Sequence, residues 1–308
     1  MVKNLIIKSS YSMLPDGSLK SNWGDLLRST VLLECIEGPF LWLTDARGKG
    51  LLRWFMEPEN IITMGDETGA LFASMPVKIL NADNYVPDRE LFMKLTGSWH
   101  GFIPDSRGGV APQNPMVAAT EPYRGGAGPI SYQQALVEGL GFKWDEQDYA
   151  TCRIEHETVS DVGLNNNVHA EWLSKMWPAE NWERSADALG KFCSVAWQQG
   201  LDDLDEYIRW MAACRLIVTQ DTLGLHLASA LRKRVVAIVG PTENREFSYA
   251  RIVSLKPESR DCMPCNEPSC RMGSSCLSEV AVEEVLNAVK GMLSGKGSGN
   301  PTTTLHTR

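Results

Sequence analysis

Short apolar runs, each bounded by Gly, Pro, Asn or Asp, recur along the first half of this chain. Such runs between turn-forming residues predict β-strands. Between the first two runs, apolar residues repeat at helical spacing over residues 23–38 and stop before a glycine. The pattern therefore predicts a strand–helix–strand beginning with further strands after it. The expected strands lie at residues 5–7, 40–43, 61–62 and 77–80.

The clearest hydrophobic pattern covers residues 216–242. A β-rich run at 216–218 is followed by apolar residues at helical spacing from 223 to 231. A second buried run at 235–239 is closed by a Gly-Pro-Thr turn. This order of elements predicts a strand–helix–strand unit of a parallel sheet.

Polar and small residues fall where the first strand of this unit ends and its helix begins. They are Asp221, Thr222, Gly224 and His226. Open parallel sheets bind ligands at this edge, and the N–H groups of a helix N-terminus suit a phosphate or pyrophosphate. Gly224 is expected to let the backbone approach a ligand closely, and the ring of His226 to face the same opening. An ordinary capped helix with a satisfied histidine is the alternative that spacing leaves open.

Other segments are less regular. Residues 101–130 are rich in Gly and Pro and predict a long loop. Residues 131–147 predict a helix followed by a linker. The polar residues from 294 to 308, rich in Gly, Ser and Thr, predict a disordered tail.

Length and composition are those of an ordinary globular protein. The 308 residues are 43% hydrophobic and 22% charged, and are enough for two domains. No apolar run reaches the length of a membrane-spanning helix, and the N-terminus is too short and polar for a signal peptide, so we expect a cytoplasmic protein. The net charge of −8 argues against a nucleic-acid partner.

The segment around residue 221 resembles the signature of glycosyltransferase family 9, the ADP-heptose:lipopolysaccharide heptosyltransferases and their relatives. The matching residues are Asp221, Thr222, His226, Leu227, Ala228, Gly240, Pro241 and Thr242. The chain departs from the family at Leu223, where a glycine is usual, and carries its glycine one position later. The resemblance implies a pocket for a nucleotide-diphosphate sugar. Its implied donor-binding residues are Asp221, Thr222, Leu223, Gly224, His226 and Thr242.

A Gly-Asp pair follows the first strand in the family, and its aspartate is the proposed catalytic base. Asp25, in Trp23-Gly24-Asp25, occupies that place, after a loop at 11–22 that is longer than in many relatives. Glycosyl transfer needs a base that takes the proton of the acceptor hydroxyl. The alternative is that Asp25 merely caps the helix that starts here.

Residues 173–182 resemble the family's Lys-x-Trp-Pro segment. Lys175, Trp177, Pro178 and Trp182 are all in register. The resemblance gives Lys175 the task of neutralising charge on the departing nucleotide diphosphate. A solvated surface lysine is the alternative.

Four of the eight cysteines form a C-x₂-C-x₄-C-x₅-C cluster. These are Cys262, Cys265, Cys270 and Cys276. Four neighbouring thiolates can hold Zn²⁺ or iron, and some relatives with a similar segment hold iron. A structural Fe or Zn site, reduced thiols that only pack, and disulfides all remain open. Catalysis itself is expected to need no cofactor.

Together these features predict an α/β protein of GT-B architecture, with two Rossmann-like domains and an interdomain cleft. Residues 1–152 would bind the acceptor, residues 153–293 would bind the nucleotide sugar, and 294–308 would form the tail. The expected enzyme is an inverting, metal-independent glycosyltransferase that moves a sugar from a nucleotide-diphosphate donor. The main expectation for the sugar is a heptose, carried by an ADP-heptose-like donor. Its acceptor would be a glycan or glycolipid of lipopolysaccharide type, which allows peripheral contact with the inner face of the membrane. The alternatives are a non-catalytic nucleotide-sugar-binding relative, or an epimerase or hydrolase on the same fold.

Overall fold

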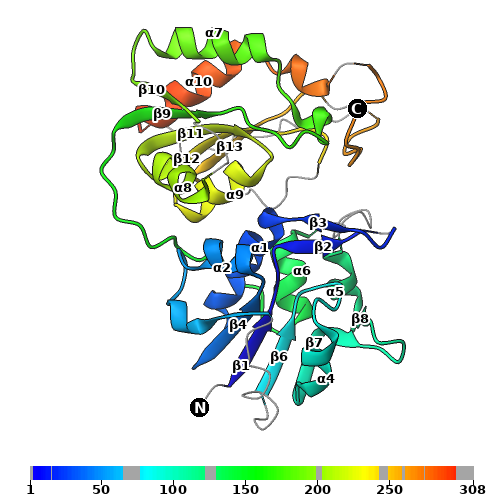
Figure 1. The fold of residues 1–308 in the computed structure, drawn as a ribbon. Coiled ribbons are helices and arrows are strands. Elements are labelled where there is room, and N and C mark those ends of the chain that lie inside the picture. Colours follow the sequence, from blue (N-terminus) through cyan, green and yellow to red (C-terminus); the bar gives the residue numbers. More distant parts are fainter. Residues whose placement is uncertain are drawn as a thin grey trace. The chain divides into compact units, whose positions relative to one another are not determined.

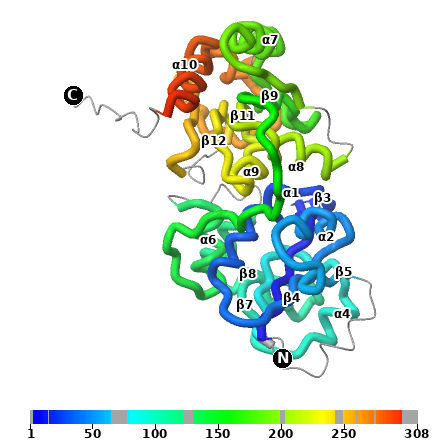
Figure 2. Tube along the Cα trace, turned by 90° about the vertical axis from the view of Figure 1, so that its left-hand side faces the viewer, coloured from blue at the N-terminus to red at the C-terminus, as the bar shows by residue number. Residues whose placement is uncertain are grey.

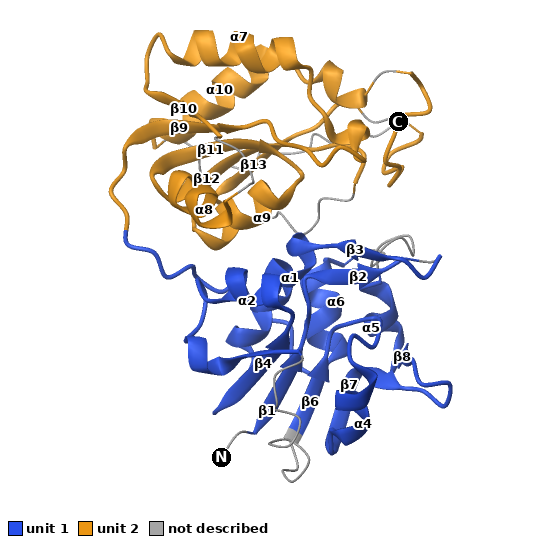
Figure 3. Ribbon diagram, in the orientation of Figure 1, with its two compact units in different colours: residues 1–155 blue, residues 156–308 orange. Residues whose placement is uncertain are grey.

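A computed structural model describes residues 3–14, 16–64, 77–121, 130–198, 203–242, 249–258, 261–273 and 275–295. The chain divides into two compact units, residues 1–155 and 156–308 (Figure 3). Each unit is built around its own parallel sheet with helices packed against it, as expected for two Rossmann-like domains. The predicted cleft between them stays a prediction, and residues 296–308 of the expected tail lie outside the described part.

The sheet of the first unit has six strands in the order β5-β4-β1-β6-β7-β8. The strands are β1 (Asn4–Ile7), β4 (Phe40–Thr44), β5 (Ile61–Thr63), β6 (Val77–Asn81), β7 (Gly97–Pro104) and β8 (Val110–Pro112). All pair in parallel except β8, which runs antiparallel to β7. Every residue of β1 is buried, because this strand lies in the middle of the sheet with side chains covered on both faces.

A separate hairpin of β2 (Tyr11–Met13) and β3 (Leu19–Ser21) leaves the end of β1 before the first helix (Figure 1). The helices of this unit are α1 (Trp23–Ser29), α2 (Ala46–Leu52), α4 (Arg89–Lys94), α5 (Pro115–Ala119) and α6 (Tyr132–Gly139). Each of these helices is capped by a side chain that accepts a hydrogen bond from a backbone N–H in the first turn. The capping residues are Asn22, Asp45, Asp88, Asn114 and Ser131.

The sheet of the second unit has five parallel strands in the order β10-β9-β11-β12-β13. The strands are β9 (Ser160–Asn165), β10 (Val195–Trp197), β11 (Cys214–Gln220), β12 (Arg234–Ile238) and β13 (Ile252–Leu255). The helices α7 (Ala179–Leu189) and α10 (Val282–Leu293) cover one face of this sheet. The helices α8 (Leu204–Ala212) and α9 (Leu223–Ala230) cover the other (Figure 1 and Figure 2). The predicted strand–helix–strand unit is thus confirmed as β11-α9-β12.

Two sequence-based expectations are wrong in detail. The segment 101–130 is not one long loop, because its described part holds the end of β7, strand β8 and helix α5. The helix predicted over 23–38 ends at Ser29 and continues only as a 3₁₀ turn, Thr30–Glu34. Among the described residues, no helix is long and apolar enough to cross a membrane.

Candidate active site

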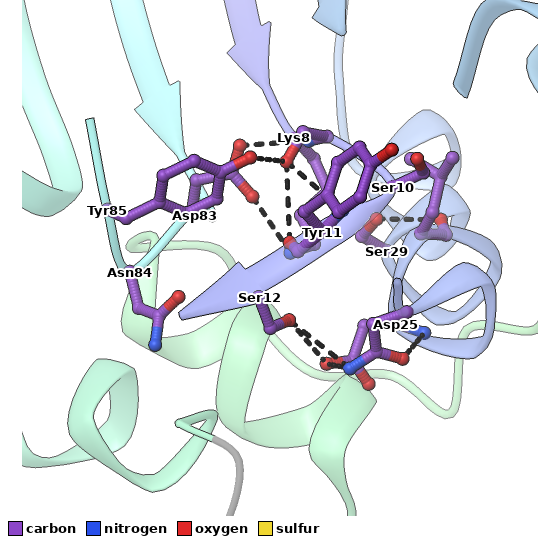
Figure 4. A network of polar contacts seen from close by, with 12 residues as sticks. Lys8, Ser10, Tyr11, Ser12, Asp25, Ser29, Asp83, Asn84 and Tyr85 are labelled. Atoms are coloured by element: carbon purple, nitrogen blue, oxygen red, sulfur yellow. Dashed lines mark hydrogen bonds and ion pairs between the residues drawn. The ribbon is translucent and has the colours of Figure 1, made fainter. Parts of the chain in front are cut away.

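Polar residues from three neighbouring strands meet at the carboxyl edge of the first unit's sheet (Figure 4). Lys8 directly follows β1, and its ammonium forms a buried ion pair with Asp83, which follows β6, at 2.9 Å. Asp45, which follows β4, accepts hydrogen bonds from the backbone N–H and the hydroxyl of Ser10. This edge is where open parallel sheets bind ligands. The ion pair therefore fixes the side chains of Lys8 and Asp83 at the base of a candidate ligand site.

Asp25 lies on α1 and is 3% exposed. One carboxylate oxygen pairs with Arg28, and the other accepts from Asn22 Nδ2 and from Ser12 Oγ, the latter at 3.3 Å. The helix cap is Asn22, whose side-chain oxygen accepts from the Asp25 N–H at 3.1 Å. The alternative that Asp25 serves as the cap of this helix is therefore wrong, and its carboxylate is aimed at the hairpin and Arg28 instead.

A small cavity of about 10 Å³, room for about one water molecule, lies beside this carboxylate. Its lining includes Asp25, Lys8, Ser12, Asn84 and Tyr132. Burial lowers the pKa of Lys8, but the attraction of Asp83 and of the other nearby anionic groups outweighs it, so Lys8 stays protonated. Burial raises the pKa of Tyr132, which keeps the phenol neutral. The pocket therefore offers hydrogen-bonding groups whose charges are already paired, which suits a neutral hydroxyl.

Asp221 is the centre of the second unit's site. Its carboxylate accepts from Lys175 Nζ at 2.8 Å and from the hydroxyl of Thr242. Burial raises the pKa of Asp221, but Lys175 and His226 together with the hydrogen bond from Thr242 lower it from 3.8 to about 2. Residues predicted from two separate motifs, Lys175 from one and Thr242 from the other, are thus brought together by the ionised carboxylate of Asp221. The lysine is not a solvated one: its side chain is only 16% exposed.

The N-terminus of α9 stands beside this carboxylate. Thr222 is its cap, with a side-chain oxygen that accepts from the Gly224 N–H at 3.3 Å, and Leu223 is the first helical residue. His226 lies in the same helix, 7% exposed, close enough to Asp221 to lower its pKa. The first-turn N–H groups and the Lys175 ammonium together form an environment that suits a diphosphate.

Gly224 has a packing role in addition to the ligand role that its position predicts. A Cβ at this residue would come within 2.0 Å of the Asn165 amide and 2.6 Å of the Tyr207 hydroxyl. Those two side chains hydrogen-bond to each other at 3.1 Å under the helix. The glycine therefore lets α9 approach β9 and α8, and its expected close approach to a ligand stays a prediction. The shifted glycine of this chain is explained by packing.

Two tryptophans hold the turn that carries Lys175. Trp177 and Trp182 are almost fully buried, with ring centroids 5.2 Å apart and an edge-on geometry. The Trp177 indole N–H donates to the Val280 carbonyl at 3.0 Å. Gln220 donates from its amide to the Lys175 carbonyl at 2.5 Å. The motif residues around Lys175 are thus core anchors that place the lysine.

In the described part of the chain, no group of three or more His, Cys, Asp or Glu side chains is placed to hold an ion, so a structural Fe or Zn site at the four clustered cysteines stays a prediction. Cys262 is exposed, Cys265 and Cys270 are partly exposed, and Cys276 is buried. All eight cysteines are free thiols, so the disulfide alternative is wrong.

Asp221 makes the stability of this unit pH-dependent. Its folded-state pKa of about 2 lies below its ordinary value, so its carboxylate stabilises the fold above about pH 4 and the contribution is lost as the pH falls toward 2. The contribution is about 2 kcal/mol. We expect the difference in unfolding free energy between the wild type and Asp221→Asn, measured with urea, to shrink by that amount between pH 7 and pH 2. If the difference in unfolding free energy does not change with pH, the low folded-state pKa of Asp221 is contradicted.

Sequence reasoning missed the polar network of the first unit. Lys8 and Asp83 are 75 positions apart, and only the parallel pairing of β1 with β6 brings them together. The available signal is a charged residue within two positions of the end of each of two buried strands. The sequence pattern predicts a long loop for Ser12 and Asn22, although both contact Asp25.

Comparison with known proteins identifies the relatives. Residues 200–275 match glycosyltransferase family 9 (heptosyltransferase). Lipooligosaccharide heptosyltransferase 2 of Campylobacter jejuni serotype O:2 is 30% identical over 86 residues, which are 27% of this chain and 27% of that protein. The protein of the same name from serotype O:6 is 29% identical over 83 residues, 26% of each chain. The alignment thus spans about a quarter of the length of these curated relatives, and the predicted resemblance is confirmed.

Solved structures share the fold over nearly the whole chain. Escherichia coli heptosyltransferase WaaC with ADP has a TM-score of 0.62 at 14% identity, covering 94% of this chain and all of that one. E. coli ADP-heptose lps heptosyltransferase II has a TM-score of 0.56 at 13% identity, covering 96% and 99%. The iron-containing dodecameric glycosyltransferase TibC of enterotoxigenic E. coli also scores 0.56 at 13% identity, covering 96% and 78%. These likenesses confirm the predicted fold class.

Proposed function

We propose that this chain, which is similar to glycosyltransferase family 9, transfers a sugar from a nucleotide-diphosphate donor to a hydroxyl group of a glycan or glycolipid. A heptose donor and a lipopolysaccharide-type acceptor have the strongest support, because the curated relatives are lipooligosaccharide heptosyltransferases. The observation that carries the proposal is the mostly buried Lys175 ammonium, which pairs with Asp221 just before the N-terminus of α9.

The second unit would bind the donor diphosphate. An ammonium has three donors, and Asp221 occupies one of those of Lys175. The remaining donors and the Leu223 N–H are available to phosphate oxygens, whereas the Thr222 N–H donates to the Gln220 carbonyl at 2.9 Å and the Gly224 N–H to the Thr222 hydroxyl at 3.3 Å. As the bond between the anomeric carbon and the phosphate oxygen breaks, negative charge grows on that diphosphate, and these groups stabilise it. Asp221 and Thr242 then position Lys175, and His226 supports the charge of Asp221.

The first unit would bind the acceptor and supply the base. The acceptor oxygen attacks the anomeric carbon while its proton moves to a carboxylate oxygen of Asp25. One C–O bond forms, the C–O bond to the diphosphate breaks, and the nucleoside diphosphate leaves with the electron pair. This single displacement inverts the anomeric centre. Arg28, Asn22 and Ser12 hold the Asp25 carboxylate in place.

The proposed donor and acceptor classes suggest where in the cell the enzyme acts. A lipid-linked glycan lies at a membrane, and ADP-heptose-type donors are water-soluble. We therefore place the protein in the cytoplasm, with transient contact at the inner face of the membrane.

A ligand screen tests the donor class. Thermal unfolding is measured with ADP, GDP, UDP and CDP, each far above its expected Kd. A ligand that binds only the folded protein raises the apparent Tm, so the matching nucleotide is expected to give a shift that the others do not. ADP is expected to give the largest one. Four equal shifts, or none, contradict a nucleotide-specific donor site.

Metal removal is expected to leave the reaction rate unchanged, because Lys175 and the helix N-terminus supply the positive charge that the leaving diphosphate needs. Initial rates with EDTA and with added Mg²⁺ are compared with the untreated protein. A rate that falls more than about tenfold with EDTA and recovers with a divalent ion contradicts the proposal.

Elemental analysis of protein purified without oxygen decides separately whether the four clustered cysteines hold structural Fe or Zn.

A further inference from the structure

The segment that carries the four clustered cysteines contacts both sides of the donor site. We define the cysteine loop as residues 261–273 together with Ser275 and Cys276. It has almost no regular secondary structure, since only its last residue begins the 3₁₀ turn Cys276–Glu279. The position of this loop is therefore defined by its contacts with the rest of the second unit.

Ser174, directly before Lys175, is the main point of attachment. It is 3% exposed, its backbone N–H donates to the Pro268 carbonyl at 2.9 Å, and its hydroxyl donates to the Glu267 carbonyl at 2.6 Å. The Ser275 hydroxyl donates to the Ser174 carbonyl at 2.8 Å. Every polar group of Ser174 is thus bonded to the cysteine loop.

The same loop contacts the turn at 240–242. The Asn266 N–H donates to the Pro241 carbonyl at 2.8 Å. Gly240 packs so closely that a Cβ there would meet the Cys276 sulfur at 3.2 Å and the Leu277 side chain at 2.6 Å. The loop is therefore joined to the residue before Thr242 as well as to the residue before Lys175.

We infer that the cysteine loop is a brace that sets the spacing of Lys175 and Thr242 around Asp221, with Ser174 and Ser275 as positioning residues for binding of the donor diphosphate. The inference rests on the proposed function.

The physical reason is the short length of the turn that carries Lys175. The 3₁₀ turn Leu173–Lys175 has three residues and no side-chain cap, so it cannot fix its own backbone. Leu173, the first residue of the turn, and Met176, the residue after it, are both exposed. A lysine side chain that is placed in advance loses less conformational entropy when it binds phosphate.

The experiment uses the full chain and measures binding of ADP and of adenosine by titration calorimetry. The variants are Ser174→Ala, Ser275→Ala and the double variant. Ser275→Thr keeps the hydroxyl, and Ser269→Ala removes an exposed hydroxyl from the same loop. We expect each single alanine variant to bind ADP about three- to tenfold more weakly and the double variant to lose more, because each lacks one hydrogen bond of the brace. Adenosine affinity is expected to stay unchanged in all of them, since adenosine has no phosphate.

Ser275→Thr and Ser269→Ala are expected to bind ADP like the wild type. Alanine variants that bind ADP normally overturn the inference, as does an equal loss of adenosine and ADP affinity, which shows a general effect on folding. The single variants give this answer even if the double variant does not fold. A wild-type protein that binds adenosine but gains nothing from the two phosphates overturns the proposed donor site itself, a result that differs from every outcome above.

Discussion

Replacement of Asp25 by Asn is expected to reduce kcat by about a thousandfold, in line with the usual contribution of a general base. An amide of the same shape keeps the contacts to Ser12 and Asn22 but cannot take the proton of the acceptor hydroxyl. ADP affinity is expected to stay within about twofold, because the groups proposed to bind the diphosphate all lie in the second unit. Steady-state kinetics together with ADP titration measure both quantities.

The matched control is Asp88→Asn. Asp88 caps α4 and Asn is an equally good cap, so this variant makes the same chemical change at a helix start outside the site. We expect it to keep wild-type kcat. If Asp25→Asn retains more than about a tenth of the wild-type rate while folding normally, Asp25 is not the base.

Replacement of Lys175 by Ala is expected to weaken ADP binding by about a hundredfold, the effect of losing about 3 kcal/mol. Two causes add. The phosphate oxygens lose a cationic donor, and the Asp221 carboxylate, 7% exposed, loses its partner and repels the diphosphate. The variant is also expected to be destabilised by about 3 kcal/mol, because it leaves a buried charge without its counter-ion.

A second substitution separates these two effects. In Lys175→Ala combined with Asp221→Asn, no unpaired carboxylate remains, so we expect most of the stability to return while ADP affinity stays low. Calorimetric titration and urea unfolding are both measured on the single and double variants. If the double variant recovers ADP affinity as well as stability, Lys175 acts only as the partner of Asp221 and is not a phosphate ligand.

The donor side of this protein could be predicted from sequence because its chemistry follows the hydrophobic pattern closely. The residues from Asp221 to His226 come directly after a buried strand, so the position of the strand locates them at the edge of the sheet. Lys175 lies 46 positions before Asp221 and Thr242 lies 21 positions after it, and only the resemblance connects them with Asp221. The structure adds the geometry of that connection, a shared carboxylate oxygen.

The acceptor side could be predicted only in part, because its contacts depend on register and packing. Asp25 was identified by the resemblance, but its partner Ser12 lies on a hairpin of three-residue strands, too short for a clear alternating pattern. The environment of Gly224 also depends on packing that the sequence alone does not reveal. The sequence indicates that a side chain is excluded there, and only the structure shows that Asn165 and Tyr207 exclude it.

Transfer of heptose from ADP-heptose to a heptose-deficient lipooligosaccharide, followed by mass spectrometry of the acceptor, tests the central claim most directly. The account predicts that the acceptor gains one heptose, that one ADP is released for each transfer, and that Asp25→Asn removes the product. Release of free heptose at the same rate without any acceptor, or an ADP-heptose that neither binds nor reacts, would contradict it.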